Sequence, residues 1–209
     1  MSAGGPERSK EIDLQLVGVV GLHPSIREMF PSMTEENFYL RKFLRLSDGN
    51  SSSYEDPRLK RVVFHLFHTA IADDTLTAVA TGKSRRIDTL CIKNDAHGGD
   101  VLTGFSDDEA LSVVEDLDLP FLMSYRLALA KRMLQEARTM PQDHWNKTAD
   151  NDLVEAVALK SYRPDVAKEI IRFWQGKQNR FFIEHAISHH QQHFGQVIEL
   201  LGQTVGPKY

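Results

Sequence analysis

Four histidines lie within nine residues near the C-terminal end of the chain: His185, His189, His190 and His193. In a helix, residues four apart lie one above the other on the same face. His189 and His193 can therefore hold one metal ion between them. Imidazole nitrogens suit zinc, nickel, copper or iron much better than calcium or magnesium. This spacing predicts one half of a divalent transition-metal site.

The other two histidines of this group are weaker candidates. His185 is four residues before His189, but it is eight residues from His193, or about 12 Å along a helix axis. We expect His185 to be an outer neighbour of the ion. His190 points about 100° away from His189 and is predicted to be incidental. The alternative is that all four are exposed polar residues of a helix without a metal.

A stable site needs at least one more ligand, since catalytic metal sites commonly have three protein ligands and an open position. His65 and His68 lie on a predicted helix among apolar residues, where a neutral imidazole needs a polar partner. Helical bundles build metal sites from side chains on facing helices. Either histidine could be the third ligand, and a core histidine bonded to a backbone carbonyl is an equally good interpretation of each.

The apolar periodicity predicts a mainly helical chain. Polar loops are expected at 47–53, 87–105 and 141–152. The expected fold is an all-α antiparallel four-helix bundle with long inter-helix loops. The predicted helices begin at Pro24, near Thr34, at Pro57, after Ser106–Glu109, at Pro120, at Leu153 and at Asp165. The helix at Pro57 follows the N-cap Asp56 and is expected to end near Val79, before Gly82, and Ser106–Glu109 has the form of a capping box. The last helix is expected to run from Asp165 to near Gly202.

Composition limits the class of protein. The 209 residues are 41% hydrophobic and 26% charged, as in ordinary globular proteins. A net charge of −4 argues against nucleic acid as the main partner, and no apolar run reaches the roughly 18 residues that span a membrane. The single cysteine, Cys91, favours a reducing compartment and is interpreted as buried filler. We expect a cytoplasmic protein with a disordered lead-in at 1–10 and one domain at 11–206.

Three segments resemble the DinB/YfiT-like family. The segment from His185 to Gln196 resembles the last-helix signature, in which two histidines four apart are followed by one residue and then Gly-Gln. The segment from His68 to Asp73 is similar to the second-helix signature, a histidine followed five residues later by an acidic residue, and this register favours His68 over His65. Residues 25–38 look like the end of that family's first helix and the acidic turn after it.

This resemblance implies a DinB-like four-helix bundle, often dimeric, with a three-histidine metal site. The implied ligands are His68, His189 and His193, with His65 as the alternative to His68. Zinc or nickel is the expected metal, with iron or manganese also compatible. Three further residues are expected to orient the ligand imidazoles from outside: His185, Gln196 and Asp73.

The resemblance also implies a reaction class, because family members include thiol-dependent S-transferases and a thiol-dependent isomerase. We expect a metal-dependent enzyme that activates a low-molecular-weight thiol or water for transfer or hydrolysis on a small-molecule substrate. One alternative is a non-catalytic metal- or small-molecule-binding bundle. Another is a biosynthetic lyase or cyclase, in which 97–100 and 143–145 bring acid or base groups to the same pocket.

Overall fold

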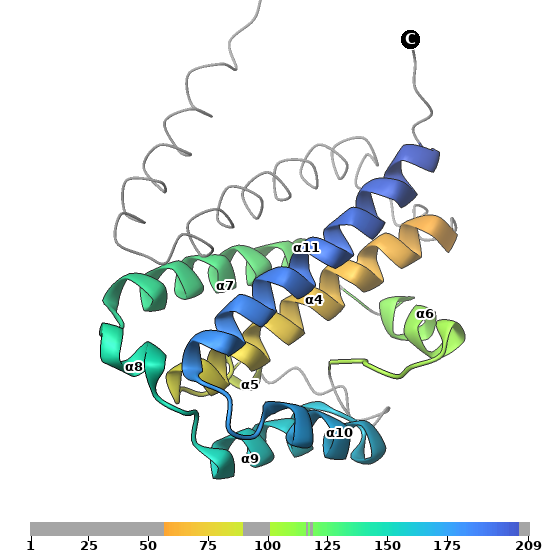
Figure 1. Cartoon of the computed structure of the whole chain (residues 1–209). Helices are drawn as coiled ribbons and strands as arrows, with labels where there is room; N and C mark the ends of the chain where they lie inside the picture. Colours follow the sequence, from red (N-terminus) through yellow and green to blue (C-terminus); the bar gives the residue numbers. More distant parts are fainter. Residues whose placement is uncertain (1–56, 90–100, 116, 118, 205–209) are drawn as a thin grey trace, which may run out of the picture.

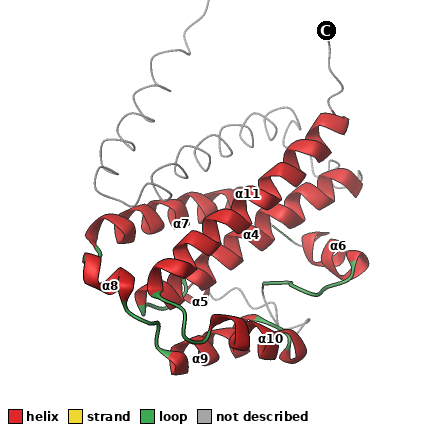
Figure 2. Ribbon diagram, viewed as in Figure 1, coloured by secondary structure: helices red, strands yellow, loops and turns green. Residues whose placement is uncertain are grey.

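A computed structural model of the chain describes residues 57–89, 101–115, 117 and 119–204. These residues are mainly helical and, apart from one isolated bridge between Thr148 and Gln178, carry no β-structure (Figures 1 and 2). The helices are α4 (Pro57–Thr81), α5 (Arg86–Thr89), α6 (Asp107–Glu115), α7 (Leu119–Thr139), α8 (Gln142–Asn146), α9 (Asn151–Ser161), α10 (Pro164–Trp174) and α11 (Asn179–Thr204).

The all-α expectation is therefore confirmed for the part of the chain that the structure describes. The four-helix bundle remains a prediction, because the helices expected at Pro24 and Thr34, like the lead-in at 1–10, lie outside the described residues. None of the described helices is both long enough and apolar enough to cross a membrane.

Helix α4 lies at the centre of the described structure, with α11 packed along it (Figure 1). From Val62 to Ala80 every side chain of α4 is buried except Phe64 and His65, which are partly buried. A helix that is buried on all sides must be apolar or small around its whole circumference. The run of valine, leucine, phenylalanine, alanine and threonine in α4 meets this condition, and the polar residues among them are placed in the interior.

The long helices differ in direction. His65 and His68 of α4 lie opposite His193 and His189 of α11, so these two helices are antiparallel. Helix α7 runs in the same direction as α4, since Arg126 in its first half bonds to the Leu66 carbonyl within α4 and Glu136 near its end pairs with Lys83, which follows α4. Within the described residues α11 is thus antiparallel to α4 and α7 is parallel to it, and the antiparallel four-helix bundle remains a prediction.

Several helix ends follow the predicted signals. Gly82 has a φ of 69° directly after α4, and this left-handed backbone is what ends the helix. Before α6, the backbone N–H of Ser106 donates to Glu109 Oε2 at 2.8 Å, and the N–H of Glu109 donates to Ser106 Oγ at 3.3 Å. This is the predicted capping box, which satisfies two backbone donors that the helix itself leaves unpaired.

The single long helix expected from Asp165 to near Gly202 is wrong, because the structure divides it into α10 and α11. Gly176, with a φ of 73°, lies in the link between them. The link also pairs with the segment after α8: the Ala149 N–H donates to the Lys177 carbonyl and the Asn179 N–H to the Lys147 carbonyl, both at 2.9 Å. These bonds replace the helical bonds that a continuous helix would have made there.

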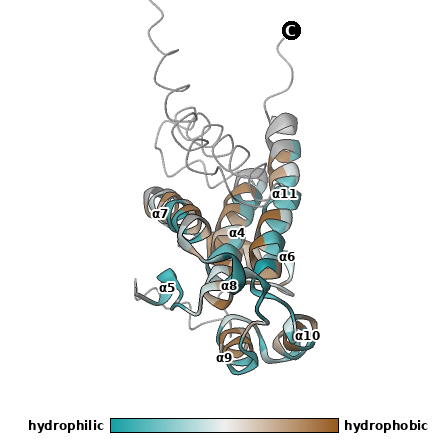
Figure 3. Cartoon of the chain, turned by 60° about the vertical axis from the view of Figure 1, so that its left-hand side comes forward, coloured by the Kyte–Doolittle hydropathy of each residue, from teal (hydrophilic) through white to brown (hydrophobic). Residues whose placement is uncertain are grey.

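Helices α9 and α10 form a hairpin beside α4 and the start of α11 (Figure 3). Trp174, at the end of α10, is 1% exposed and packs against Phe182 of α11 and Tyr162 after α9. The polar loop expected at 141–152 contains α8, whose Trp145 is buried. The hairpin and α8 together hold the first turns of α11, which fixes the rotation of α11 about its axis.

Candidate metal centre

Two antiparallel helices bring four histidines together. His65 and His68 are three residues apart on one face of α4, and His189 and His193 are four apart on one face of α11. The ring centroids of His189 and His193 are 4.5 Å apart, and the ring of His68 lies 5.0 Å and 4.7 Å from those two. The expectation that a histidine of α4 meets the pair on α11 is confirmed as a matter of geometry.

The nitrogens of three of these rings converge. The Nε2 atom of His189 lies 3.2 Å from Nε2 of His68 and 3.1 Å from Nε2 of His193. One ligand nitrogen from each of these residues lies within 4.8 Å of the other two. Three nitrogens that each lie 2.0–2.1 Å from a tetrahedral zinc ion would be roughly 3.3 Å apart. The spacing of the imidazoles therefore fits a divalent metal ion. We call His68, His189 and His193 the histidine triad.

The orientation of His68 is fixed by a backbone group. Its Nδ1 atom lies 2.5 Å from the carbonyl oxygen of Val101, which can only accept a hydrogen bond. The proton of the neutral ring must therefore be on Nδ1, which leaves the lone pair on Nε2 directed at the triad. The N–H of Val101 donates in turn to the carbonyl of Ser161 at the end of α9. This carbonyl bond is the one expected of a core histidine, and it is also the arrangement by which proteins orient metal-ligating histidines.

The segment that presents the Val101 carbonyl has unusual backbone geometry. Leu102 is 2% exposed and has a φ of 63°, a left-handed conformation that costs a branched residue energy. Gly104 has a φ of 82°, and a Cβ atom placed on it would be 3.0 Å from Val166 Cγ2 in α10. The backbone conformation of this turn is therefore held by the packing around it, and not by the conformational preference of Leu102.

Replacing Gly104 with alanine is expected to destabilise the fold more than replacing Gly82. Both glycines have positive φ, so each alanine costs about 1 kcal/mol of backbone strain, but a Cβ at Gly82 meets nothing within 4 Å. The clash with Val166 should add about 1 kcal/mol to the loss for Gly104→Ala. Urea unfolding of the two variants measures this difference. Equal losses would show that the contact with α10 does not constrain the turn.

Burial keeps the triad neutral. It lowers the pKa of His189 to about 3 and that of His68 to about 4, and the neighbouring imidazoles add to both shifts. Burial also lowers the pKa of His193, although a hydrogen bond with Gln196 opposes that shift. The neutral imidazole is the form that binds a metal ion. At neutral pH the three rings are therefore already in the protonation state that a ligand set requires.

His65 lies just outside the triad. Its Nδ1 atom is 2.9 Å from Nδ1 of His193, on the side of that ring away from Nε2. Burial first, then His193 and Arg61, lower the pKa of His65 to about 4. The alternative in which His65 replaces His68 as a ligand receives no support from this geometry, since His68 and not His65 directs a nitrogen at the converging Nε2 atoms.

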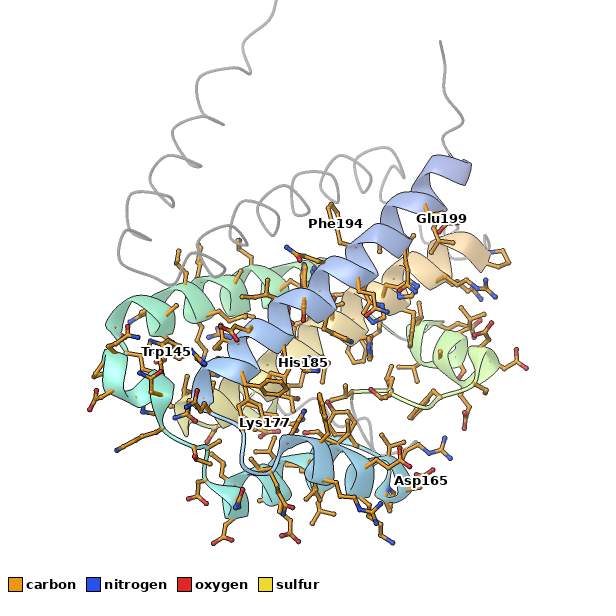
Figure 4. The ribbon with its side chains drawn as sticks, in the orientation of Figure 1. Trp145, Asp165, Lys177, His185, Phe194 and Glu199 are labelled. Carbon is orange, nitrogen blue, oxygen red and sulfur yellow. The ribbon has the colours of Figure 1, made fainter. Side chains whose placement is uncertain are left out.

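Of the three outer residues expected from the sequence, Gln196 hydrogen-bonds to His193. His185 lies next to the triad, with its ring centroid 6.2 Å from that of His189. Its ring is stacked on Phe181, over which Lys177 also lies, beside the link between α10 and α11 (Figure 4). The ring of His185 is thus stacked on Phe181 and lies edge-on to Phe173.

The third outer residue, Asp73, is bonded to His190. The Oδ2 atom of Asp73 lies 3.0 Å from Nδ1 of His190, with 2% and 4% of the two residues exposed. The prediction that His190 is incidental missed this buried pair between α4 and α11. The sequence does contain a signal that His190 is buried. It lies three residues after Ile187 and four after Ala186, which are buried residues on the same face of the helix.

Residues 97–100 and 143–145 were expected to bring acid or base groups to the pocket for a lyase or cyclase reaction. Residues 97–100, like Cys91, lie outside the described residues. His144 of the other segment lies in α8, where Nε2 is 2.8 Å from the carbonyl oxygen of Ala80. Ala80 is twelve residues after His68 on α4, or roughly 18 Å along the axis. His144 therefore belongs to the packing at the far end of α4.

The chain was also compared with known proteins. No protein-family model, curated protein or solved structure matches it. The arrangement of the histidines is therefore the observation from which a function can be inferred.

Proposed function

We propose that this chain is a metal-dependent enzyme of the DinB/YfiT-like kind, in which His68, His189 and His193 hold one divalent transition-metal ion through Nε2. The observation that carries the proposal is the convergence of three Nε2 atoms while the Nδ1 proton of His68 is directed away, at Val101. Three neutral nitrogen ligands favour zinc or nickel over magnesium or calcium.

The number of histidine ligands that converge within the described part of the chain supports catalysis over a purely structural role. Structural zinc sites are closed by four protein ligands, whereas catalytic sites have three and an open position. A divalent metal in this position supplies acidity, since it lowers the pKa of water or of a thiol and so provides a nucleophile at neutral pH. We propose transfer to, or hydrolysis of, a small molecule, with the thiol or water as the second reactant.

The residues of the chain would have distinct tasks in this reaction. Val101, which is 1% exposed, would cover the buried side of the triad, where its carbonyl oxygen meets Nδ1 of His68. His189 and His193 are partly exposed, so a reactant can approach from the side of α11. Val101 holds His68 in one tautomer, which keeps its Nε2 lone pair in place without reorganisation.

The first test is metal content. Protein purified without a nickel column is expected to contain about one zinc or nickel ion per chain, because three imidazoles in this geometry form a tight site. The double variant His68→Ala, His189→Ala is expected to contain almost none, with an unchanged helical circular dichroism spectrum. Elemental analysis of the two samples measures this. Equal metal content in both proteins would sink the proposal.

A turnover assay then separates an enzyme from a non-catalytic metal-binding module. The zinc-loaded wild type is expected to accelerate the reaction of a small thiol with a chromogenic electrophile, or the hydrolysis of an activated ester, and the double variant is not. A wild-type protein that holds zinc but shows neither reaction would leave metal binding in place and remove the catalytic part of the proposal.

A further inference from the structure

A fourth histidine contacts the triad without contributing to it. His65 lies one helical turn before His68 on α4, opposite His193 of α11. The two Nδ1 atoms are 2.9 Å apart, and the ring centroids of His65 and His193 are 5.0 Å apart at an angle of 40°. This distance is that of a normal N–H···N hydrogen bond, so one of the two nitrogens carries a proton and the other accepts it.

The chemistry of a metal site decides which nitrogen is the donor. A neutral imidazole has one N–H and one lone pair. If the Nε2 lone pair of His193 is directed at a metal, the ring proton must be on Nδ1. His65 must then accept with Nδ1 and carry its own proton on Nε2.

We propose that His65 is a positioning residue of the metal centre: by accepting a hydrogen bond from His193 Nδ1, it fixes the tautomer and the ring orientation in which His193 Nε2 faces the ion. This inference rests on the proposed metal site and extends it by one residue. It gives His193 the kind of support that the Val101 carbonyl gives His68, from a side chain in place of the backbone.

The three ligands are then supported unequally. His68 and His193 each have a partner at Nδ1, whereas Nδ1 of His189 is buried and has no hydrogen-bond partner within the described part of the chain. Gln196 also hydrogen-bonds to His193. Removal of such an outer partner typically lowers metal affinity by about 10–100-fold.

Substitutions at His65 can separate positioning from packing. His65→Leu keeps a similar volume beside Phe64 and removes the acceptor. His65→Asn is smaller but can place its amide oxygen near the position of Nδ1, so it restores an acceptor while it worsens the packing. A purely structural role predicts that Asn is the more harmful change, and positioning predicts that Leu is. His144→Leu removes a partly buried histidine at the far end of α4, where its Nε2 atom lies 2.8 Å from the carbonyl oxygen of Ala80, and it serves as the control.

The test is a zinc titration in competition with a chromophoric chelator, on the full chain and on each variant. We expect His65→Leu to bind zinc about 10–100-fold more weakly than the wild type, and His65→Asn and His144→Leu to stay within a few-fold of it. If the wild type binds no zinc, the proposed function itself fails. If the wild type and His65→Leu bind zinc equally, the site stands and the role of His65 is overturned.

Nuclear magnetic resonance of the wild type provides a readout that does not depend on any variant. Long-range ¹⁵N–¹H correlations of zinc-loaded protein are expected to show the His193 proton on Nδ1 and the His65 proton on Nε2. A His65 proton on Nδ1 would overturn the proposal, even if His65→Leu proved too unstable to titrate.

Discussion

Acidification from pH 7 to pH 4 is expected to remove much of the folding stability of the metal-free protein. His68 is 6% exposed, and its pKa is about 4 in the fold against an ordinary value of 6.5. In the unfolded chain this imidazole becomes protonated as the pH falls below 6.5, whereas in the folded chain it stays neutral until the pH approaches 4. Stability that is fully present above pH 6.5 is lost across this window.

The expected loss is large because several groups act in the same direction. A shift of this size at His68 alone is worth about 3 kcal/mol, at 1.36 kcal/mol per pKa unit. The pKa values of His189 and His65, about 3 and about 4, are also lowered, chiefly by burial. These two rings are more exposed to solvent, which screens their interactions, so each adds less than its shift suggests. Native domains have only about 5–15 kcal/mol of stability in total.

Urea unfolding between pH 7 and pH 4, with a chelator present, measures this dependence. The variant His68→Gln, His189→Gln has no titrating group at these positions and is expected to show a shallower fall in unfolding free energy. Carboxyl groups of the unfolded chain titrate near pH 4, so the upper part of the window reports on histidines. An identical slope in the two proteins would contradict the assignment of the acid sensitivity to the triad.

The helices could be predicted where local signals act alone. Pro57 and Gly82 bound α4, and Ser106 with Glu109 caps α6, because each of these signals is satisfied by the chain within a few residues. The break at Gly176 was missed, since the apolar periodicity continues through it. That break depends on backbone bonds to the segment after α8, which no local pattern reveals.

The same limit applies to the site. The spacing of His189 and His193 places both on one face of a helix, and this was sufficient to predict their proximity. His65 and His68 share a face of α4, so their own spacing does not choose between them. The choice depends on the axial register of two antiparallel helices. The Val101 carbonyl could not have been predicted, because every residue has such a group and only the fold selects one.

Replacement of His190 with leucine is expected to lower the free energy of unfolding strongly, because it weakens the packing of α11 on α4. Leucine has a similar volume, so the main effect is electrostatic. The Asp73 carboxylate, 2% exposed, would lose the imidazole that lies 3.0 Å from its Oδ2 atom. The pair is ionic when the imidazole is protonated. Removal of one member of a buried ion pair typically costs about 3–5 kcal/mol, because the remaining charge is left in a medium of low polarity.

A second substitution tests this explanation. In the double variant Asp73→Asn, His190→Leu, the buried group is a neutral amide, and more than half of the lost stability should return. Denaturant unfolding of the two single variants, the double variant and the wild type completes the cycle. A loss below about 1 kcal/mol for His190→Leu would mean that the pair contributes little. Zinc affinity should be nearly unchanged in every variant that folds, because His190 supports the helix pair and the triad alone supplies the nitrogens.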